Sequence, residues 1–143
     1  MLPGLEGNIL FWLDAHFPGA DHGLRDYNAE LDEQVRCPLE SELEVISRFR
    51  AGREDVFIID DLRLYLRGTY ENGNLHEGIR PPPQPGIDFI YRLFGDSHHI
   101  IKLNYDEGYV LLLPIEHAPN IYVKRDLLLD PDSEIARLLR ERS

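Results

Sequence analysis

Short apolar runs alternate with longer polar segments along this chain. Residues 9–13 (ILFWL) form an unbroken apolar run that ends at Asp14, and residues 56–59 (VFII) form a second run that ends at Asp60. Apolar runs of this length are typical of strands buried on both faces, as in a parallel sheet covered by helices. We therefore expect two buried strands, with Trp12 as a core residue of the first.

The clearest helical pattern lies between these two runs. In residues 38–50, Leu39, Leu43 and Ile46 recur at the i, i+4, i+7 spacing of one helix face, and Pro38 suits a first helical turn. A strand, a helix and a second strand in this order form a βαβ unit. The pattern therefore predicts that the two strands are parallel neighbours in one sheet.

The rest of the chain predicts two further helices and a hairpin. Residues 87–94 read as a short amphipathic helix, and residues 133–142 read as a second one that follows a capping sequence, DPDS. Residues 98–104 and 109–114 are apolar runs separated by YDEG, which predicts an antiparallel hairpin that turns near Gly108. Two stretches rich in glycine, proline and charge are expected to be loops: residues 18–36 and 65–86.

Composition and charge narrow the class of protein. The 143 residues have room for one domain, residues 1–143, and the net charge is −11, with 26 acidic against 15 basic residues. The negative electrostatic field of such a charge repels polyphosphate, so we expect neither nucleic acid nor an anionic membrane surface as a partner. The longest apolar runs are far shorter than the roughly 18 residues that cross a bilayer. With Cys37 as the single cysteine and no secretory leader pattern, we expect a cytoplasmic protein.

Candidate chemistry gathers where the two predicted strands end. Asp14 follows the first strand, Asp60 and Asp61 follow the second, and the carboxyl ends of neighbouring parallel strands meet at one edge of a sheet. Three carboxylates about 5 Å apart need a cation or a proton to compensate them, and oxygen ligands suit Mg²⁺, Ca²⁺ or Mn²⁺. His16, two residues after Asp14, is a candidate general base. The alternative is that these aspartates only cap helices or mark turns.

Three segments resemble a known family. ILFWLDAHF, CPLESELEVI and DVFIIDDLRLY are similar to the second half of class I S-adenosylmethionine-dependent methyltransferases, nearest to the macrocin-type sugar O-methyltransferases. The resemblance covers about residues 8–114. In that family the fourth strand ends in an acid, the fifth ends in an Asp-Asp pair, and an antiparallel sixth and seventh strand close the sheet. It therefore implies an α/β fold: a partial, mostly parallel Rossmann-like sheet with a C-terminal antiparallel hairpin and flanking helices.

The resemblance also implies roles for individual residues. Asp14, Asp60 and Asp61 would hold a divalent cation, usually Mg²⁺, that binds vicinal hydroxyls of a small-molecule substrate and lowers the pKa of the hydroxyl to be methylated. His16 would stand at the position of the general base, where the family more often has Asp. The family binds S-adenosylmethionine with its first three strands. These strands have no counterpart here, so methyl transfer needs a cofactor-binding half from elsewhere.

A half-sheet leaves the outer edge of its first strand open, which invites pairing with another chain. We therefore expect either a homo-oligomer that pairs through this edge or a chain that is shortened from a longer protein. Two other functions stay open at this point. One is a non-catalytic methyltransferase-fold remnant that acts in assembly or binding. The other is a metal-dependent hydrolase unrelated to S-adenosylmethionine, built on Asp14, His16, Asp60 and Asp61. No phosphate-binding GxxxxGK[ST], dinucleotide-binding GxGxxG or GxSxG nucleophile motif favours a different enzyme class.

Overall fold

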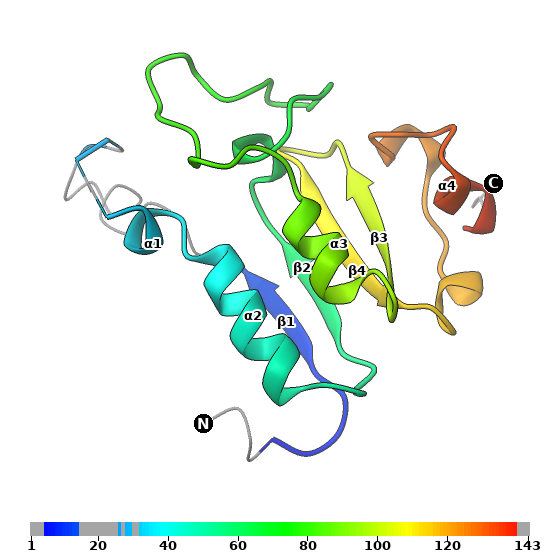
Figure 1. Ribbon diagram of the computed structural model, residues 1–143. Helices are drawn as coiled ribbons and strands as arrows, with labels where there is room; N and C mark the ends of the chain where they lie inside the picture. Colours follow the sequence, from blue (N-terminus) through cyan, green and yellow to red (C-terminus); the bar gives the residue numbers. More distant parts are fainter. Residues whose placement is uncertain (1–4, 15–25, 27, 30–31, 140–143) are drawn as a thin grey trace.

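The computed structural model describes residues 5–14, 26, 28–29 and 32–139. Its centre is a four-stranded mixed sheet in the order β1-β2-β4-β3 (Figure 1). The strands are β1 (Leu10–Leu13), β2 (Val56–Ile59), β3 (His98–Leu103) and β4 (Tyr109–Pro114). The pair β1 and β2 is parallel, as the βαβ pattern predicts, and β4 is antiparallel to both β2 and β3.

The expectation of a mostly parallel sheet is wrong, since only one of the three strand pairings is parallel. The reason is the place of the hairpin. Its second strand, β4, is the one that pairs with β2, so an antiparallel strand separates β2 from β3. The C-terminal antiparallel hairpin and the α/β class are confirmed. Because β4 is antiparallel to β2, and β3 is antiparallel to β4, β3 runs in the same direction as β1 and β2.

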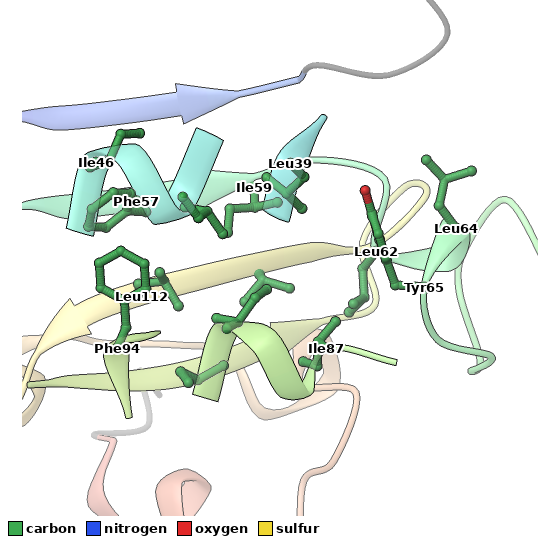
Figure 2. Close-up of a cluster of buried hydrophobic side chains, with 14 of the residues drawn as sticks. Leu39, Ile46, Phe57, Ile59, Leu62, Leu64, Tyr65, Ile87, Phe94 and Leu112 are labelled. Carbon is green, nitrogen blue, oxygen red and sulfur yellow. The ribbon is translucent and has the colours of Figure 1, made fainter. Parts of the chain in front are cut away.

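Two helices cover one face of the sheet and enclose the main core (Figures 1 and 2). They are α2 (Leu39–Phe49), which lies over β1 and β2, and α3 (Asp88–Phe94). Both agree with the sequence pattern to within one residue at each end. The labelled core side chains come from these helices, the residue before α3, β2, β4 and the segment after β2: Leu39, Ile46, Phe57, Ile59, Leu62, Leu64, Tyr65, Ile87, Phe94 and Leu112.

The other face of the sheet is only partly covered. The segment after β4 packs on β3 and β4 through a second cluster that contains Ile101, Leu113 and Leu128. On β1, by contrast, Leu10 is 62% exposed and Trp12 is 59% exposed. The prediction that Trp12 is a core residue of a strand buried on both faces is therefore wrong. The covering segment does not extend across the sheet as far as β1.

The remaining elements are short. They are α1 (Glu33–Arg36), the 3₁₀ turns η2 (Leu62–Leu64), η3 (Ala118–Asn120) and η4 (Arg125–Leu127), and α4 (Glu134–Leu138). The cap predicted for the last helix is present, since the Ser133 hydroxyl accepts a hydrogen bond from the Ala136 amide at 3.3 Å, but the helix ends at Leu138. In the described part of the chain, no helix combines the length and apolarity that a membrane crossing requires.

A buried ion pair holds together the amino ends of β1 and β2. The Arg50 guanidinium, just after α2, donates to both carboxylate oxygens of Asp55 at 2.7 and 2.8 Å and to the Leu5 carbonyl at 2.7 Å. The Asp55 carboxylate also accepts from the Ile9 amide at 2.8 Å, and its backbone carbonyl lies 2.8 Å from the His98 Nε2. Helix α2, β1, β2 and β3 are thus connected through one buried residue, Asp55.

Candidate functional site

The acids predicted at the strand ends lie at one edge of the sheet. Leu13 of β1 is paired with Ile59 of β2, so Asp14 and Asp60 are the next residues of two adjacent strands. The Asp60 amide donates to the Leu13 carbonyl at 2.9 Å, which continues the ladder to this point. The structure therefore brings Asp14 and Asp60 to the same edge, as predicted. His16 lies outside the described residues.

Asp61 turns the chain away from β2. Its backbone is left-handed, with φ 55° and ψ 48°, a conformation that Asp tolerates better than most residues with a side chain. A hydrogen bond from the Asp61 amide to the Asp60 Oδ1 at 2.7 Å supports this turn. Asp61 is 7% exposed, and its Oδ1 lies 3.7 Å from the Arg63 Nε. Although the two residues are adjacent in sequence, Asp60 continues the ladder with β1, whereas Asp61 is buried and lies near Arg63.

A fourth acid, Glu107, completes this edge and was not singled out by the sequence. It lies in the turn between β3 and β4, where it forms an ion pair with Arg63 and a hydrogen bond with the carboxyl group of Asp61. Burial, the hydrogen bond with Asp61 and the negative charge of Asp61 raise the pKa of Glu107 from 4.5 to about 7, against the opposing charge of Arg63. A carboxyl group with such a pKa can hold and release a proton at neutral pH.

The turn reaches the acids because β3 runs in the same direction as β1 and β2. The carboxyl end of β3, and the turn that follows it, therefore lie at the same edge as Asp60 and Asp61. Two backbone hydrogen bonds hold the turn in this position. The Leu62 amide donates to the Gly108 carbonyl at 2.9 Å, and the Arg63 amide donates to the Glu107 carbonyl at 3.2 Å. The signal in the sequence was the acidic hairpin turn YDEG, which only the strand order connects to β2.

Aromatic rings lie beside these acids, on the partly covered face of the sheet. The ring centroids of Trp12 and Tyr109 are 6.1 Å apart, and those of Tyr109 and Tyr105 are 6.4 Å apart. Burial and the nearby carboxylates, Asp60 first among them, raise the pKa of Tyr109 to about 12. Tyr109 therefore keeps its proton at neutral pH and can act as a hydrogen-bond donor beside the acids.

A groove lies on the outer side of β1, next to Asp14. It is about 660 Å³ in volume and runs between the end of β1 and the first turns of α2. Burial raises the pKa of Glu42, whose Oε2 is enclosed and has no hydrogen-bond partner in the part of the chain that the structure describes. We call this the edge groove. Its lining residues are Trp12, Leu13, Asp14, Ser41, Glu42, Val45 and Ile46.

The carboxylates present fit a cation in part. Asp14 and Asp60 offer hard oxygen ligands of the kind that Mg²⁺ prefers. The Asp61 carboxyl is turned toward Glu107 and Arg63. Over residues 5–14, 26, 28–29 and 32–139, no three His, Cys, Asp or Glu side chains gather as a metal-binding group. The ligand set Asp14, Asp60 and Asp61 stays a prediction.

The chemistry of this edge is therefore that of a carboxylate pair next to a proton-sharing Asp61–Glu107 pair, with a tyrosine hydroxyl and an open groove beside it. We call the residues Asp14, Asp60, Asp61, Glu107 and Tyr109 the carboxyl-end site.

Comparison of the chain with protein-family models, with curated proteins and with solved structures finds no match.

Proposed function

We propose that this chain is the acceptor-binding half of a metal-assisted methyltransferase. With a cofactor-binding half supplied, it would transfer the methyl group of S-adenosylmethionine to a hydroxyl of a small molecule. The observation that carries the proposal is the parallel register of β1 and β2, which sets Asp14 and Asp60 side by side at the carboxyl edge. The strand arrangement gives further support, because a parallel pair followed by an antiparallel hairpin is what the resemblance implies for the second half of such a sheet.

The cation in this proposal is Mg²⁺, held by Asp14 and Asp60. The resemblance implies Asp61 as a third ligand, whereas its carboxyl group here faces Glu107 and Arg63. When bound, a divalent cation polarises a hydroxyl oxygen and lowers the pKa of that hydroxyl. The two aspartates would also orient the acceptor at the carboxyl edge, where ligands bind in open α/β sheets.

The proton of the acceptor hydroxyl needs a group to receive it as the methyl group moves from sulfur to oxygen. His16 is the base that the resemblance implies. The Asp61–Glu107 pair is a second group suited to this task, since the pKa of Glu107 is about 7 and Arg63 holds its carboxylate in place. Tyr109, protonated at neutral pH, can donate a hydrogen bond to an acceptor oxygen.

Manganese binding tests the cation part of the proposal. Mn²⁺ substitutes for Mg²⁺ in oxygen sites, and free and bound Mn²⁺ can be separated by electron paramagnetic resonance. We expect Asp14→Asn and Asp60→Asn each to weaken Mn²⁺ binding about tenfold or more, because each removes a charged ligand. Glu116→Gln is the matched control, because Glu116 is exposed and follows β4, whose carboxyl end lies at the opposite edge of the sheet. Equal Mn²⁺ binding by all four proteins would contradict the proposed site.

Titration with S-adenosylhomocysteine, with and without Mg²⁺, tests the cofactor part. Because the resemblance assigns the strands of the described residues to the second half of the family's sheet, and not to the three strands that bind the cofactor, we expect no binding by the isolated chain up to about millimolar ligand. Micromolar binding would instead mean that this chain builds a cofactor site of its own. The proposal of a half that needs completion would then be wrong, and a self-sufficient methyltransferase would replace it.

A further inference from the structure

A second cavity lies apart from the carboxyl-end site, on the side of the sheet that the helices cover. It is about 260 Å³ in volume and lies between α1, the first turns of α2 and α3, and residues 82–84. None of the five residues of the carboxyl-end site lines this cavity. We call it the helix-end pocket.

Buried contacts hold the walls of the helix-end pocket in place. Arg36 has no exposed surface, and its guanidinium donates hydrogen bonds to the carbonyls of Arg80 and Pro81, the latter at 2.9 Å. At the other end of this proline-rich segment, the Gly86 amide donates to the Tyr65 carbonyl at 2.6 Å. Because three successive prolines also make the segment stiff, the pocket exists before a ligand enters it.

A buried hydroxyl group reaches this pocket. Tyr65 lines it and is only 9% exposed, yet its hydroxyl has no hydrogen-bond partner in the part of the chain that the structure describes. In Figure 2 this oxygen points toward the Leu39 end of α2. Burial, and after it the charge of Cys37 on the pocket wall, raises the pKa of Tyr65, so the hydroxyl keeps its proton. The Tyr70 hydroxyl, by contrast, donates to the Leu66 carbonyl at 2.8 Å. A buried polar group without a protein partner needs one from a bound molecule.

Rings and amides determine the shape and polarity of the pocket. The ring of Phe89 is inclined by 59° to that of Tyr65, with the centroids 5.8 Å apart, and residues 82–83 add two proline rings. A planar ring packs well against such a wall. The side-chain amides of Gln34 and Gln84 also line the pocket, and each can both donate and accept hydrogen bonds. These walls therefore suit a flat ring that carries a polar group.

The charges around the pocket oppose an ionised ligand. None of the described residues that line it is basic, and the whole chain has a net charge of −11, so an anion finds no partner there. Glu40 and Glu44 also line the pocket, but both bind Arg92, at 2.9 and 3.2 Å. A cationic ligand would have to compete with Arg92 for these two carboxylates. Since a buried charge without a partner is costly, the pocket favours an uncharged molecule.

We propose that the helix-end pocket binds a small, uncharged aromatic compound whose amide or hydroxyl group forms a hydrogen bond with the Tyr65 hydroxyl. The ring of this compound packs against Phe89 and the prolines, and its polar group also reaches the glutamine amides. This binding site is separate from methyl transfer and does not require a cation at the carboxyl-end site.

Alkylation of the single cysteine tests the proposal, because Cys37 lines the pocket. Benzamide is the probe, and mass spectrometry measures how far it slows the reaction of Cys37 with iodoacetamide. We expect half-maximal protection at about 1 mM benzamide, as is typical of a ligand of this size. Benzoate and benzamidine have nearly the same shape but carry a negative and a positive charge. Each should bind more weakly than benzamide, by about tenfold or more.

Two tyrosine variants locate the hydrogen bond. Tyr65→Phe removes only the hydroxyl and should weaken benzamide binding about fivefold. Tyr70→Phe is the matched control and should bind benzamide like the wild type, because the Tyr70 hydroxyl is engaged by Leu66. Urea unfolding adds a measurement that a purely structural role of Tyr65 would change. Tyr65→Phe should unfold at the same urea concentration as the wild type, whereas Tyr70→Phe should unfold at a lower one.

Three outcomes would overturn the proposal. Without protection by about 20 mM benzamide, the pocket holds only water. If benzoate or benzamidine protects Cys37 as well as benzamide does, or if Tyr65→Phe binds benzamide like the wild type, the ligand class or its contact is wrong. If Tyr65→Phe loses as much stability as Tyr70→Phe, the Tyr65 hydroxyl has a structural partner instead of a ligand.

Discussion

The proton affinity of Glu107 is set by neighbours that are distant in the sequence. Asp61 comes from the turn after β2 and Arg63 from η2, and both contact a side chain in the hairpin turn. The two carboxyl groups share a proton more easily than they both ionise, whereas Arg63 favours the ionised form. Two of the acids at this edge, Asp61 and Asp106, also have left-handed backbones, with φ of 55° and 54°. Strained positions of this kind cluster at functional sites.

Titration of Glu107 by carboxyl-carbon NMR should give a pKa of about 7 in the wild type. In Asp61→Asn we expect this pKa to fall toward its ordinary value, because the charge that opposes ionisation is gone. Since the folded-state pKa lies above the unfolded value, Glu107 stabilises the fold at low pH and loses this contribution as the pH rises from about 4.5 to about 7.

The same linkage gives a stability test. Glu107→Gln, which imitates the protonated carboxyl group, should be more stable than the wild type at pH 8 in urea unfolding, and this difference should shrink toward pH 4.5. Glu134→Gln, an exposed acid on α4, should show no such trend. A variant at position 107 that loses stability equally at both pH values would contradict the assigned protonation.

At the scale of the element, the hairpin turn depends on one glycine. Gly108 has φ +89°, and a side-chain carbon there would overlap the ring of Tyr70. Its carbonyl also accepts the Leu62 hydrogen bond that fastens the turn to η2. The conformation and the close approach both require a residue without a side chain. The position of Glu107 next to Asp61 therefore depends on its neighbour in the turn.

Gly108→Ala should destabilise the fold by about 2–4 kcal/mol, because it combines a positive φ with an overlap in the core. Gly73→Ala is a matched control, since Gly73 has φ +77° but open space where a Cβ would be added, and should cost only about 1–2 kcal/mol. Urea unfolding of both variants gives the two values. Equal losses would mean that the Tyr70 ring moves aside at little cost.

At the scale of the molecule, the buried Arg50–Asp55 pair holds several elements together. Both side chains are nearly inaccessible, at 3% and 2% exposed. Burial alone would raise the pKa of Asp55, but hydrogen bonds from Arg50 and Ile9, with the charges of Arg50 and His98, lower it instead. An acid with a depressed pKa stabilises the fold above its unfolded pKa, and this contribution is lost as the pH falls below about 4.

Asp55→Asn should cost about 3–5 kcal/mol of stability at neutral pH, because it leaves the Arg50 charge buried without its partner. The double variant Arg50→Met/Asp55→Leu should cost less than the single one, since it removes both charges. Asp132→Asn is the control: its ion pair with Arg125 is exposed and should be worth about 1 kcal/mol or less. A single variant at Asp55 as stable as the wild type would show that water reaches Arg50.

The elements that the sequence predicted well are those defined by local pattern. A βαβ unit is specified by the apolar runs before Asp14 and Asp60 together with the i, i+4, i+7 stripe of α2. The crossover through a helix makes the two strands parallel. That is why Asp14 and Asp60 were predicted to meet. Helix α3 and the hairpin followed from the same kind of signal. Each of these predictions needed only neighbours along the chain.

What the sequence by itself determined is therefore the four strands, helices α2 and α3, the parallel pair and its two strand-end acids. Helix α1, by contrast, lies in a segment that the sequence predicted to be a loop. Only the tertiary structure decided which strand of the hairpin pairs with β2, and with it the contact of Glu107 with Asp61. It also decided that Trp12 is exposed, because the depth of a residue depends on how far a distant segment extends over the sheet. Local pattern fixes periodicity, but contacts between distant segments depend on packing that no single segment encodes.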